Sequence, residues 1–439
     1  MACAGVEAGG VLWRVLGSDR EALTAQLGSV VGDIEAGRLK DQKSGRRKQL
    51  YDVRLGDGSE HLLKVNHYVG LAACWRRLRG SKARREERLA RTAHGRGLPT
   101  PLPVAWGERH RGGRLEACFL LVPRLAGVAD LMQLQNDRSL SRRSRLALAA
   151  AFGRLARQVH QAGLRQDDFA PNNFLARLGP EPELFVIDFE RARMRSGPVP
   201  RAACVPALVR LDRRLPEVSN AERWRFLLAY TGSRRAARCW WRELAGLAPR
   251  VALEDLAHLR RTTTRKGRRF EPVPAVEGFG WERRDGASRT LRRQGSETAS
   301  TWTRRVPAAS RRRGRELWAM ANLLWLRGLA PRPRAWLHGQ MGAALVFEPL
   351  DDAQRLSELT HPARLVGALE KLLGRLLALG RLLPELTAHE IAVLDADAAH
   401  PRLGLLAPER MVVGDALPPE SRLREARDRA RALLASCGS

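Results

Sequence analysis

The chain of 439 residues is long enough for two to three domains with sizeable hydrophobic cores. Its 77 Lys and Arg outnumber its 47 Asp and Glu, and the resulting charge of +30 favours an anionic partner such as a phospholipid surface, a phosphorylated glycolipid or nucleic acid. We expect no membrane-spanning helix, secretory signal or zinc site, because the sequence has no apolar run of ~18 residues, no basic start and no C-x-x-C pair.

The stretch from about Gly37 to Asn66 is predicted to form a small antiparallel sheet, with Gly56-Asp57-Gly58 as a turn signal. Lys64 lies inside the last run, in a chain that has seven lysines and otherwise uses arginine. In a kinase, a lysine on such a strand contacts the phosphates of ATP, whereas an edge-strand lysine is a common alternative. The loop around Gly45 is the predicted cover of the nucleotide, with backbone N–H groups as phosphate contacts, although it lacks the G-x-G-x-x-G pattern.

A charge-rich helix is predicted from about Lys82 to His94, followed by glycines that can end it. Glu86 is the candidate partner of the strand lysine, because a kinase needs a glutamate on this helix to fix the aim of that lysine. The alternative is an i,i+4 partner on a solvated basic face. A proline-rich segment at 98–103 then returns the chain to strands, and a hinge between two lobes is expected at 123–125.

A long amphipathic helix is predicted from about Leu140 to Ala162, and the acidic loop after it carries the strongest chemical signal. Asp168 is followed five residues later by Asn173, and an apolar run then ends at Asp188. Phosphoryl transfer from ATP needs a carboxylate that orients the attacking hydroxyl, and an amide and a second carboxylate that hold Mg²⁺ against the phosphates. A loop followed by a β-hairpin would supply all three groups. The alternative is a polar loop in which Asp and Asn serve as turn residues.

The adjacent acid Asp167 leaves the register of this loop open, since Asp167 and Asn172 have the same five-residue spacing. Asp168 and Asn173 are preferred, because an apolar strand then starts directly after the asparagine. Gln166 precedes the two acids and can hydrogen-bond the loop backbone, so we expect the geometry of the loop to be kept.

These elements together resemble the lipopolysaccharide kinases of the Kdo/WaaP family, a branch of the protein-kinase-like fold, over about the first 265 residues. The resemblance rests on HLLKVN, SKARREERLA, GLPTPLP, DFAPNNFL and VIDFERAR, and on a late helix, ERWRFLLAY, at 222–230. It implies an α+β fold and phosphorylation of a heptose or Kdo hydroxyl of the lipopolysaccharide inner core, with ATP and Mg²⁺. It also implies roles for individual residues: Asp168 as catalytic acid, Asn173 and Asp188 as Mg²⁺ ligands, and Lys64 with Glu86 as the phosphate-aligning pair.

A second domain is predicted after a basic linker at 266–280 that contains Pro and Gly. Residues 315–336 (RELWAMANLLWLRGLAPRPRAW) parallel residues 85–106 (REERLARTAHGRGLPTPLPVAW). A repeat of this length favours duplication over chance. The predicted fold is therefore a tandem of bilobal protein-kinase-like domains, with a catalytic domain at 1–265 and a degenerate kinase-like domain at 281–439.

The catalytic residues do not recur in the second half. In a rough alignment Lys64 corresponds to Arg305, and the three polar positions Asp168, Asn173 and Asp188 correspond to Thr387, Ala392 and Ala407. Without an asparagine and a hairpin aspartate, this half cannot build a two-ligand Mg²⁺ site, so it is predicted to be a pseudokinase that acts as a scaffold, a regulator or a substrate-docking module. The alternative is an unrelated α/β tail.

The charge and the resemblance together predict a cytoplasmic enzyme that acts on the lipopolysaccharide core glycolipid, peripheral on the anionic inner face of the inner membrane. Two alternatives stay open: a kinase for a small-molecule or protein hydroxyl, and a wholly non-catalytic pair of pseudokinases. Nucleic-acid binding is disfavoured and no such partner is expected, since tyrosine and phenylalanine are sparse and neither a stacking platform nor a reading helix is indicated.

Overall fold

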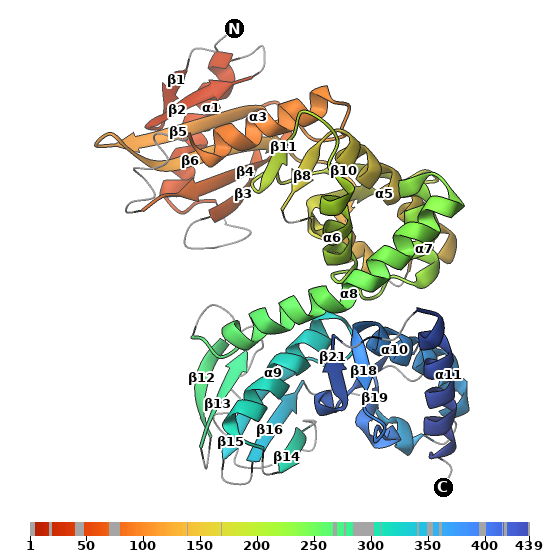
Figure 1. The fold of residues 1–439 in the computed structure, drawn as a ribbon. Helices are drawn as coiled ribbons and strands as arrows, with labels where there is room; N and C mark the ends of the chain where they lie inside the picture. Colours follow the sequence, from red (N-terminus) through yellow and green to blue (C-terminus); the bar gives the residue numbers. More distant parts are fainter. Residues whose placement is uncertain are drawn as a thin grey trace. The chain divides into compact units, whose positions relative to one another are not determined.

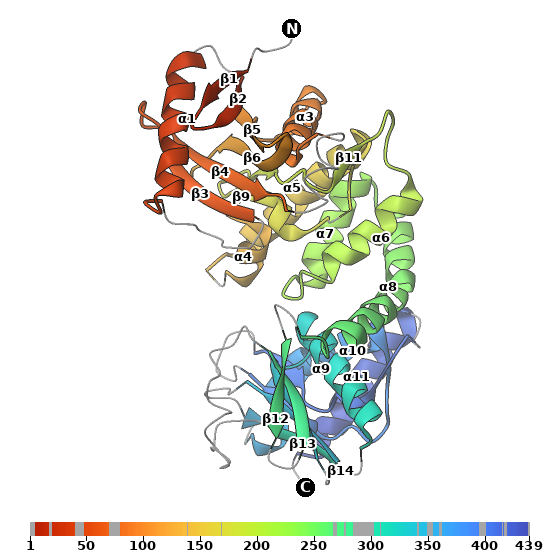
Figure 2. The same cartoon turned by 90° about the vertical axis from the view of Figure 1, so that its left-hand side faces the viewer.

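The protein, described here from a computed structural model, divides into two compact units (Figures 1 and 2). The first unit consists of Met1–Ala207 with Val218–Ala237, and the second of Leu208–Glu217 with Arg238–Ser439. Within the part of the chain that the structure describes, every helix falls short of the length and apolarity that a membrane span requires. The described residues are 5–16, 20–39, 48–69, 80–137, 139–167, 169–266, 270–275, 278–283, 303–307, 309–339, 342–348, 354–359, 362–394, 401–414, 416 and 419–437.

The first unit begins with an antiparallel sheet between two helices. Helix α1 (Arg20–Glu35) packs Leu27 and Val31 on one face, and helix α3 (Lys82–Gly95) packs Ala83 on the other (Figure 2). The strand order is β1-β2-β5-β6-β4-β3. The strands are β1 (Val6–Ala8), β2 (Val11–Val15), β3 (Lys48–Arg54), β4 (Glu60–His67), β5 (Ala105–Arg111) and β6 (Arg114–Pro123).

The alternation of β4 decides which side chains face which helix. Leu63 and Val65 belong to the core under α1. Side chains of successive strand residues point to opposite faces, so Lys64 lies on the α3 face of the sheet.

The second half of the first unit is mainly helical and holds two small antiparallel sheets, with strand orders β10-β9-β7 and β11-β8. The predicted α+β class is thereby confirmed for this unit, as are the helices predicted near 82–94 and 140–162. The elements are β7 (Val128–Asp130), α4 (Leu131–Asn136), α5 (Arg142–Gln161), β8 (Leu164–Gln166), the 3₁₀ turn η1 (Pro171–Asn173), β9 (Phe174–Arg177), β10 (Glu183–Val186), β11 (Ala192–Met194), α6 (Arg201–Asp212) and α7 (Asn220–Thr231).

Helices α5 and α7 pack closely, and this packing fixes the helix that leads into the acidic loop. A Cβ on Gly153 of α5 would lie 2.3 Å from the backbone oxygen of Phe226 in α7, so only glycine permits this approach. At the end of α5, Nδ1 of His160 lies 2.8 Å from the hydroxyl of Tyr230. The late helix predicted at 222–230 therefore supports the base of the loop.

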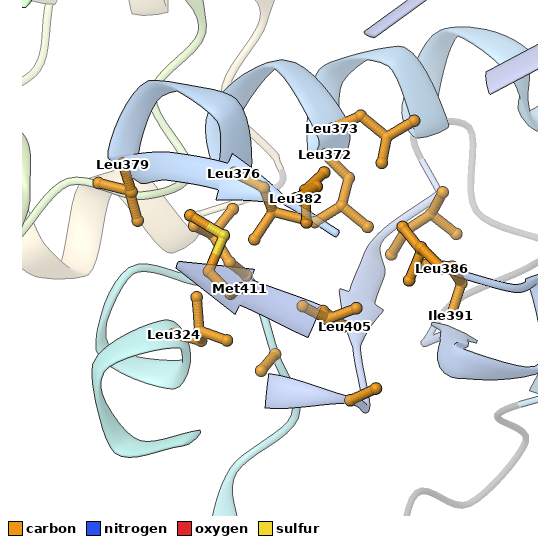
Figure 3. Packing of buried hydrophobic residues seen from close by; sticks show 14 of the residues in the cluster. Leu324, Leu372, Leu373, Leu376, Leu379, Leu382, Leu386, Ile391, Leu405 and Met411 are labelled. Atoms are coloured by element: carbon orange, nitrogen blue, oxygen red, sulfur yellow. The ribbon is translucent and has the colours of Figure 1, made fainter. Parts of the chain in front are cut away.

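The second unit also combines an antiparallel sheet with helices. Its largest core gathers Leu372, Leu373 and Leu376 with Leu405 and Met411 (Figure 3). The elements are α8 (Arg234–Thr262, shared with the first unit), β12 (Phe270–Ala275), β13 (Gly278–Arg283), β14 (Thr303–Pro307), α9 (Arg311–Leu326), β15 (Pro333–Gly339), β16 (Gly342–Phe347), β17 (Gln354–Arg355), η2 (Leu356–Glu358), η3 (Pro362–Leu365), α10 (Val366–Leu379), β18 (Gly380–Leu382), η4 (Ala388–Glu390), β19 (Ile391–Val393), β20 (Leu403–Leu405), η5 (Pro408–Arg410), β21 (Met411–Val413) and α11 (Pro419–Ala435).

The two units repeat one order of elements. The strand order β12-β13-β15-β16-β14 follows the same path as β1-β2-β5-β6-β4, with α9 placed in the chain as α3 is. The hairpin β19–β20 corresponds to β9–β10, and the pair β18–β21 corresponds to β8–β11. The internal repeat in the sequence thus has a counterpart in strand pairing.

The predicted linker at 266–280 is wrong in part, because this stretch supplies strands to the second sheet. β12 pairs with β13 from Phe270↔Arg283 to Ala275↔Gly278. Pro272 and Pro274 are tolerated because β12 is the edge strand and needs donors on one side alone. The second unit takes up the chain from Arg238 onward and also includes the segment Leu208–Glu217.

Candidate functional site

Lys64 and Glu86 form a buried ion pair between β4 and α3. The Nζ atom of Lys64 donates a hydrogen bond to Oε1 of Glu86, and the two side chains are 12% and 8% exposed. Burial acts to lower the pKa of Lys64, but the negative charges of Glu86, Asp188 and Glu190 outweigh it, so the pKa is raised. Lys64 is therefore held as a cation at the site.

The hairpin β9–β10 brings Asn173 and Asp188 to one end. The strands pair from Glu183↔Arg177 to Val186↔Phe174. Directly beyond the last pair, the N–H of Ile187 donates to the backbone oxygen of Asn173 at 2.9 Å. Asn173 closes η1 and is buried, and Asp188 follows the end of β10 by two residues.

The backbone of Asp188 adopts the left-handed conformation, which is unusual for a residue other than glycine. Among the described residues, it is the one non-glycine residue with a positive φ, at 59°. Its Oδ1 accepts a hydrogen bond from the N–H of Glu190 at 3.2 Å, a local bond of the kind that lets Asp occupy the left-handed region. Nε2 of Gln166 reaches the backbone oxygen of Asp188 at 3.5 Å, so Gln166 contacts the loop backbone as predicted.

Two predicted site residues, Asp168 and Gly45, lie outside the residues that the structure describes. The neighbouring positions are described. Asn173 is buried, whereas Asn172 is exposed. Asp167 is exposed, and its Oδ1 lies 3.6 Å from Nε of Arg165. The roles assigned to Asp168 and Gly45 stay predictions from the sequence.

Three further charged residues lie at the site and were given no role from the sequence. Oε1 of Glu190 lies 2.6 Å from Nζ of Lys82, the first residue of α3. Oε2 of Glu190 lies 3.1 Å from Nζ of Lys48, the first residue of β3. Lysine rarity, which singled out Lys64, is a signal that also fits Lys48 and Lys82, because three of the seven lysines meet here.

The charges of this cluster determine how Glu190 ionises. Burial acts to raise the pKa of Glu190, but the hydrogen bond from Lys82 and the charges of Lys48 and Lys82 outweigh it and lower the pKa to about 2. Glu190 is thus a carboxylate at any ordinary pH. Three carboxylates (Glu86, Asp188, Glu190) and three ammonium groups (Lys48, Lys64, Lys82) balance one another.

The residues at this site fit a nucleoside triphosphate with Mg²⁺. Asn173 and Asp188 offer an amide oxygen and a carboxylate at the same end of one hairpin, and Mg²⁺ prefers oxygen ligands of these kinds. Lys64 offers a fixed cation for phosphate oxygens. In the described part of the chain, no group of three or more His, Cys, Asp or Glu could hold a metal ion. The predicted Mg²⁺ ligands are one asparagine and one aspartate, a pair that this criterion does not cover.

The second unit places different residues at the corresponding positions. Lys64 and Trp106 lie on either side of β6, and both pair with Leu120. Arg304 and Trp336 lie on either side of β16 in the same way, and both pair with Leu345. The tryptophans end the two copies of the sequence repeat, so Arg304 is the counterpart of Lys64. The predicted counterpart, Arg305, is therefore wrong by one residue.

The hairpin of the second unit lacks counterparts of the two predicted Mg²⁺ ligands. In the first unit, the N–H of Ile187, the residue before Asp188, donates to the backbone oxygen of Asn173 at 2.9 Å. In the second unit, the N–H of Leu406, the residue before Ala407, donates to the backbone oxygen of Glu390 at 2.8 Å. Ala407 therefore corresponds to Asp188, as predicted. Glu390, and not Ala392, corresponds to Asn173.

Ion pairs link the charged side chains at this second position. Arg304 lies 2.8 Å from Oε1 of Glu390 and, through Nε, 2.6 Å from Oε1 of Glu409. Nε of Arg410 lies 3.1 Å from both carboxylate oxygens of Glu390, whose side chain is 5% exposed. The cation and the acids that would face a ligand are bound to each other.

Comparison with known proteins gives a family for the first unit. Residues 28–230 match the family described as "Lipopolysaccharide kinase (Kdo/WaaP) family". No curated protein matches the chain. The family match confirms the resemblance for this segment, and with it an α+β protein-kinase-like fold for the first half.

Among solved structures, similar chains cover about half of this one. "WaaP in complex with acyl carrier protein" is 22% identical over 51% of this chain and 90% of that one, with a TM-score of 0.38. An amicoumacin kinase, hAmiN, in complex with AMP-PNP, Ca²⁺ and Ami is 12% identical over 55% and 88%, with a TM-score of 0.36. The Rio2 kinase from Chaetomium thermophilum, as an ADP/Mg²⁺-phosphoaspartate complex, is 14% identical over 53% and 81%, with a TM-score of 0.29.

Proposed function

We propose that this chain, whose residues 28–230 form a Kdo/WaaP-family kinase domain, phosphorylates a heptose or Kdo hydroxyl of the lipopolysaccharide inner core with ATP and Mg²⁺. The observation that carries the proposal is the ion pair of Lys64 with Glu86, in one domain with a hairpin that ends at Asn173 and Asp188. A lysine–glutamate pair and an amide–carboxylate pair are the parts that phosphoryl transfer needs besides the base.

Each residue has a defined part in the proposed reaction. Lys64 holds phosphate oxygens in line, and Glu86 fixes the direction of the ammonium group. Asn173 and Asp188 would hold Mg²⁺, which when bound neutralises charge on the phosphates. Asp168, from the sequence, orients the acceptor hydroxyl and takes its proton.

Both the net charge and the family match support the proposed class of acceptor. A net charge of +30 suits a polyanionic glycolipid, and it would draw the protein to an anionic bilayer surface as a peripheral enzyme. We place the protein on the cytoplasmic face of the inner membrane for this reason.

The second unit is proposed to be a kinase-like domain without catalytic activity. Its strands pair in the order of the first unit. Its counterparts of Asn173 and Asp188 are Glu390 and Ala407, and Arg304 is engaged by two glutamates. Such a domain can serve as a scaffold or as a docking module for the acceptor.

Mass spectrometry of core oligosaccharide from a strain that lacks the protein tests the acceptor. The loss of one phosphate from a heptose or Kdo residue is expected. An unchanged core would show that another molecule accepts the phosphate or that the protein is not catalytic.

A further inference from the structure

Lys48 lies on the same face of the sheet as Lys64. In the pairing of β3 with β4, Leu50 is opposite Lys64 and Lys48 is opposite Asn66. Residues directly opposite each other share a face, as do residues two apart in one strand. The Nζ atom of Lys48 lies 3.7 Å from Oδ2 of Asp188. A second ammonium group therefore lies beside the candidate Mg²⁺ ligand.

Glu190 holds this ammonium group from a fixed position. Its two carboxylate oxygens bind different lysines: Lys82 at 2.6 Å and Lys48 at 3.1 Å. Its N–H is bound to Oδ1 of Asp188 at 3.2 Å. Lys82 begins α3, one helical turn before Glu86. Glu190 thus joins three elements that carry site residues.

The two lysines differ in what they can offer to a ligand. Lys64 is 12% exposed and is engaged by Glu86, whereas the side chain of Lys48 is 35% exposed between two carboxylates. The removal of Lys48 would leave Glu86, Asp188 and Glu190 facing two ammonium groups. The resulting negative charge would lie where the phosphates of a nucleotide have to approach, and like charges repel at this range.

We propose that Lys48 is a second phosphate-contacting cation of the first unit, directed at the terminal phosphates of the nucleotide, and that Glu190 is the residue that positions it. This inference rests on the proposed function as an ATP-dependent kinase. The ligand is the triphosphate end of a nucleoside triphosphate. Lys82, which binds the other carboxylate oxygen of Glu190, anchors Glu190 in this position.

Nucleotide affinity as a function of phosphate number tests the proposal. The dissociation constants of AMP-PNP, ADP and AMP, each with Mg²⁺, are measured by calorimetry on the full chain. For Lys48→Ala we expect about a 10- to 100-fold loss for AMP-PNP, the size of one charge-assisted hydrogen bond, with a smaller loss for ADP and none for AMP. Lys48→Arg should recover part of the affinity, because it keeps the charge.

If Glu190 positions Lys48, its substitution should also weaken AMP-PNP binding most, ADP binding less and AMP binding not at all, with smaller losses than in Lys48→Ala. In Glu190→Gln the lysine remains but is no longer held, so AMP-PNP affinity falls by less than in Lys48→Ala. The matched control is Arg54→Ala, which removes one cation from the other end of β3, where Arg54 lies 3.9 Å from Glu60. The control should bind all three nucleotides as the wild type does.

Three outcomes would overturn the inference, and each differs from a failure of the proposed function. An unchanged AMP-PNP affinity in Lys48→Ala would overturn it, as would an equal loss for AMP. A Glu190→Gln variant that behaves as the wild type would remove the positioning role. If Lys64→Ala weakens AMP-PNP binding while Lys48→Ala leaves the affinity unchanged, this inference alone fails. If the folded wild type does not bind AMP-PNP at all, the proposed function fails with it.

Discussion

Lys64 is buried as a cation, and Glu86 makes this tolerable. A buried charge without a partner is costly, and the removal of one member of such a pair typically costs 3–5 kcal/mol. Asp188 and Glu190 lie close enough to raise the pKa of Lys64 together with Glu86. The lysine is thus the centre of the charge arrangement at the site.

Glu86→Gln should therefore destabilise the first unit. We expect a loss of about 3 kcal/mol in the free energy of unfolding, because Lys64 keeps its charge and loses its nearest partner. Urea titration followed by circular dichroism measures it. Glu60→Gln, which affects an exposed ion pair, is the control and should change stability by less than about 0.5 kcal/mol. A loss in Glu86→Gln no larger than in the control would contradict the account.

His160 makes the first unit sensitive to acid. Burial lowers the pKa of His160 to about 4, whereas an unfolded chain has a value near 6.5. The unfolded state therefore takes up the proton first, and stability is lost as pH falls from about 6.5 to about 4, by up to about 3 kcal/mol. His160→Asn should lack this component, so its melting temperature relative to that of the wild type should rise as pH falls through that window. A constant difference from pH 7 to pH 4.5 would argue against it.

At the scale of elements, the approach of α5 to α7 depends on one missing side chain. Gly153→Ala should cost about 1–3 kcal/mol, since its Cβ would meet the backbone of α7 and neither helix can yield locally. Gly32→Ala in α1 is the matched control: a Cβ there meets nothing within 4 Å, and alanine should stabilise that helix slightly. Thermal melts of the two variants decide the point. Equal shifts would contradict the packing account.

The elements that the sequence predicted well are those with strong local signals. The helices near 82–94 and 140–162 and the hairpin that ends at Asp188 follow from apolar periodicity and turn residues. The strands at 270–275 and 278–283 could not be predicted in this way, because their Pro and Gly content is typical of a linker. The edge position of β12 and the pairing of β13 with both β12 and β15 override this local preference.

The residues that sequence analysis missed at the site are defined by long-range contacts. Lys48 and Glu190 are 142 positions apart in the chain, and Lys82 and Glu190 are 108 apart. No spacing rule joins residues over such separations. In the second unit, an error of one position in the alignment of the repeat assigned Arg305 as the counterpart of Lys64. The pairing of β14 with β16 identifies Arg304 instead.

At the scale of the whole molecule, two units with one order of elements carry different residues at the corresponding positions of their hairpins. In the first unit, Lys48 and Asp188 are each about one-third exposed. In the second, Arg304 is also about one-third exposed, but it is bound by Glu390 and Glu409, and Glu390 is also held by Arg410. The second unit thus has buried ion pairs where the first has the predicted pair of Mg²⁺ ligands.

Arg304→Ala should accordingly destabilise the second unit without touching the first. We expect a loss of about 2–3 kcal/mol, since Glu390 is buried and would lose one of its two cations. Hydrogen exchange of the amides in β19 and β20 reports this loss, and the protection of β9 and β10 should stay constant. Arg312→Ala, whose side chain is 92% exposed, is the control. Protection in β19 and β20 equal to that of the control would contradict a stabilising role for Arg304.

The most direct test of the account is phosphate transfer to inner-core oligosaccharide that lacks phosphate. The full chain is incubated with ATP, with and without Mg²⁺, and the product is weighed by mass spectrometry. We predict a Mg²⁺-dependent gain of one phosphate with the wild type, and a rate at least on the order of 100-fold lower with Asp188→Ala and with Asp168→Ala, at unchanged melting temperature. The absence of transfer by the folded wild type, or wild-type transfer by Asp188→Ala, would contradict it.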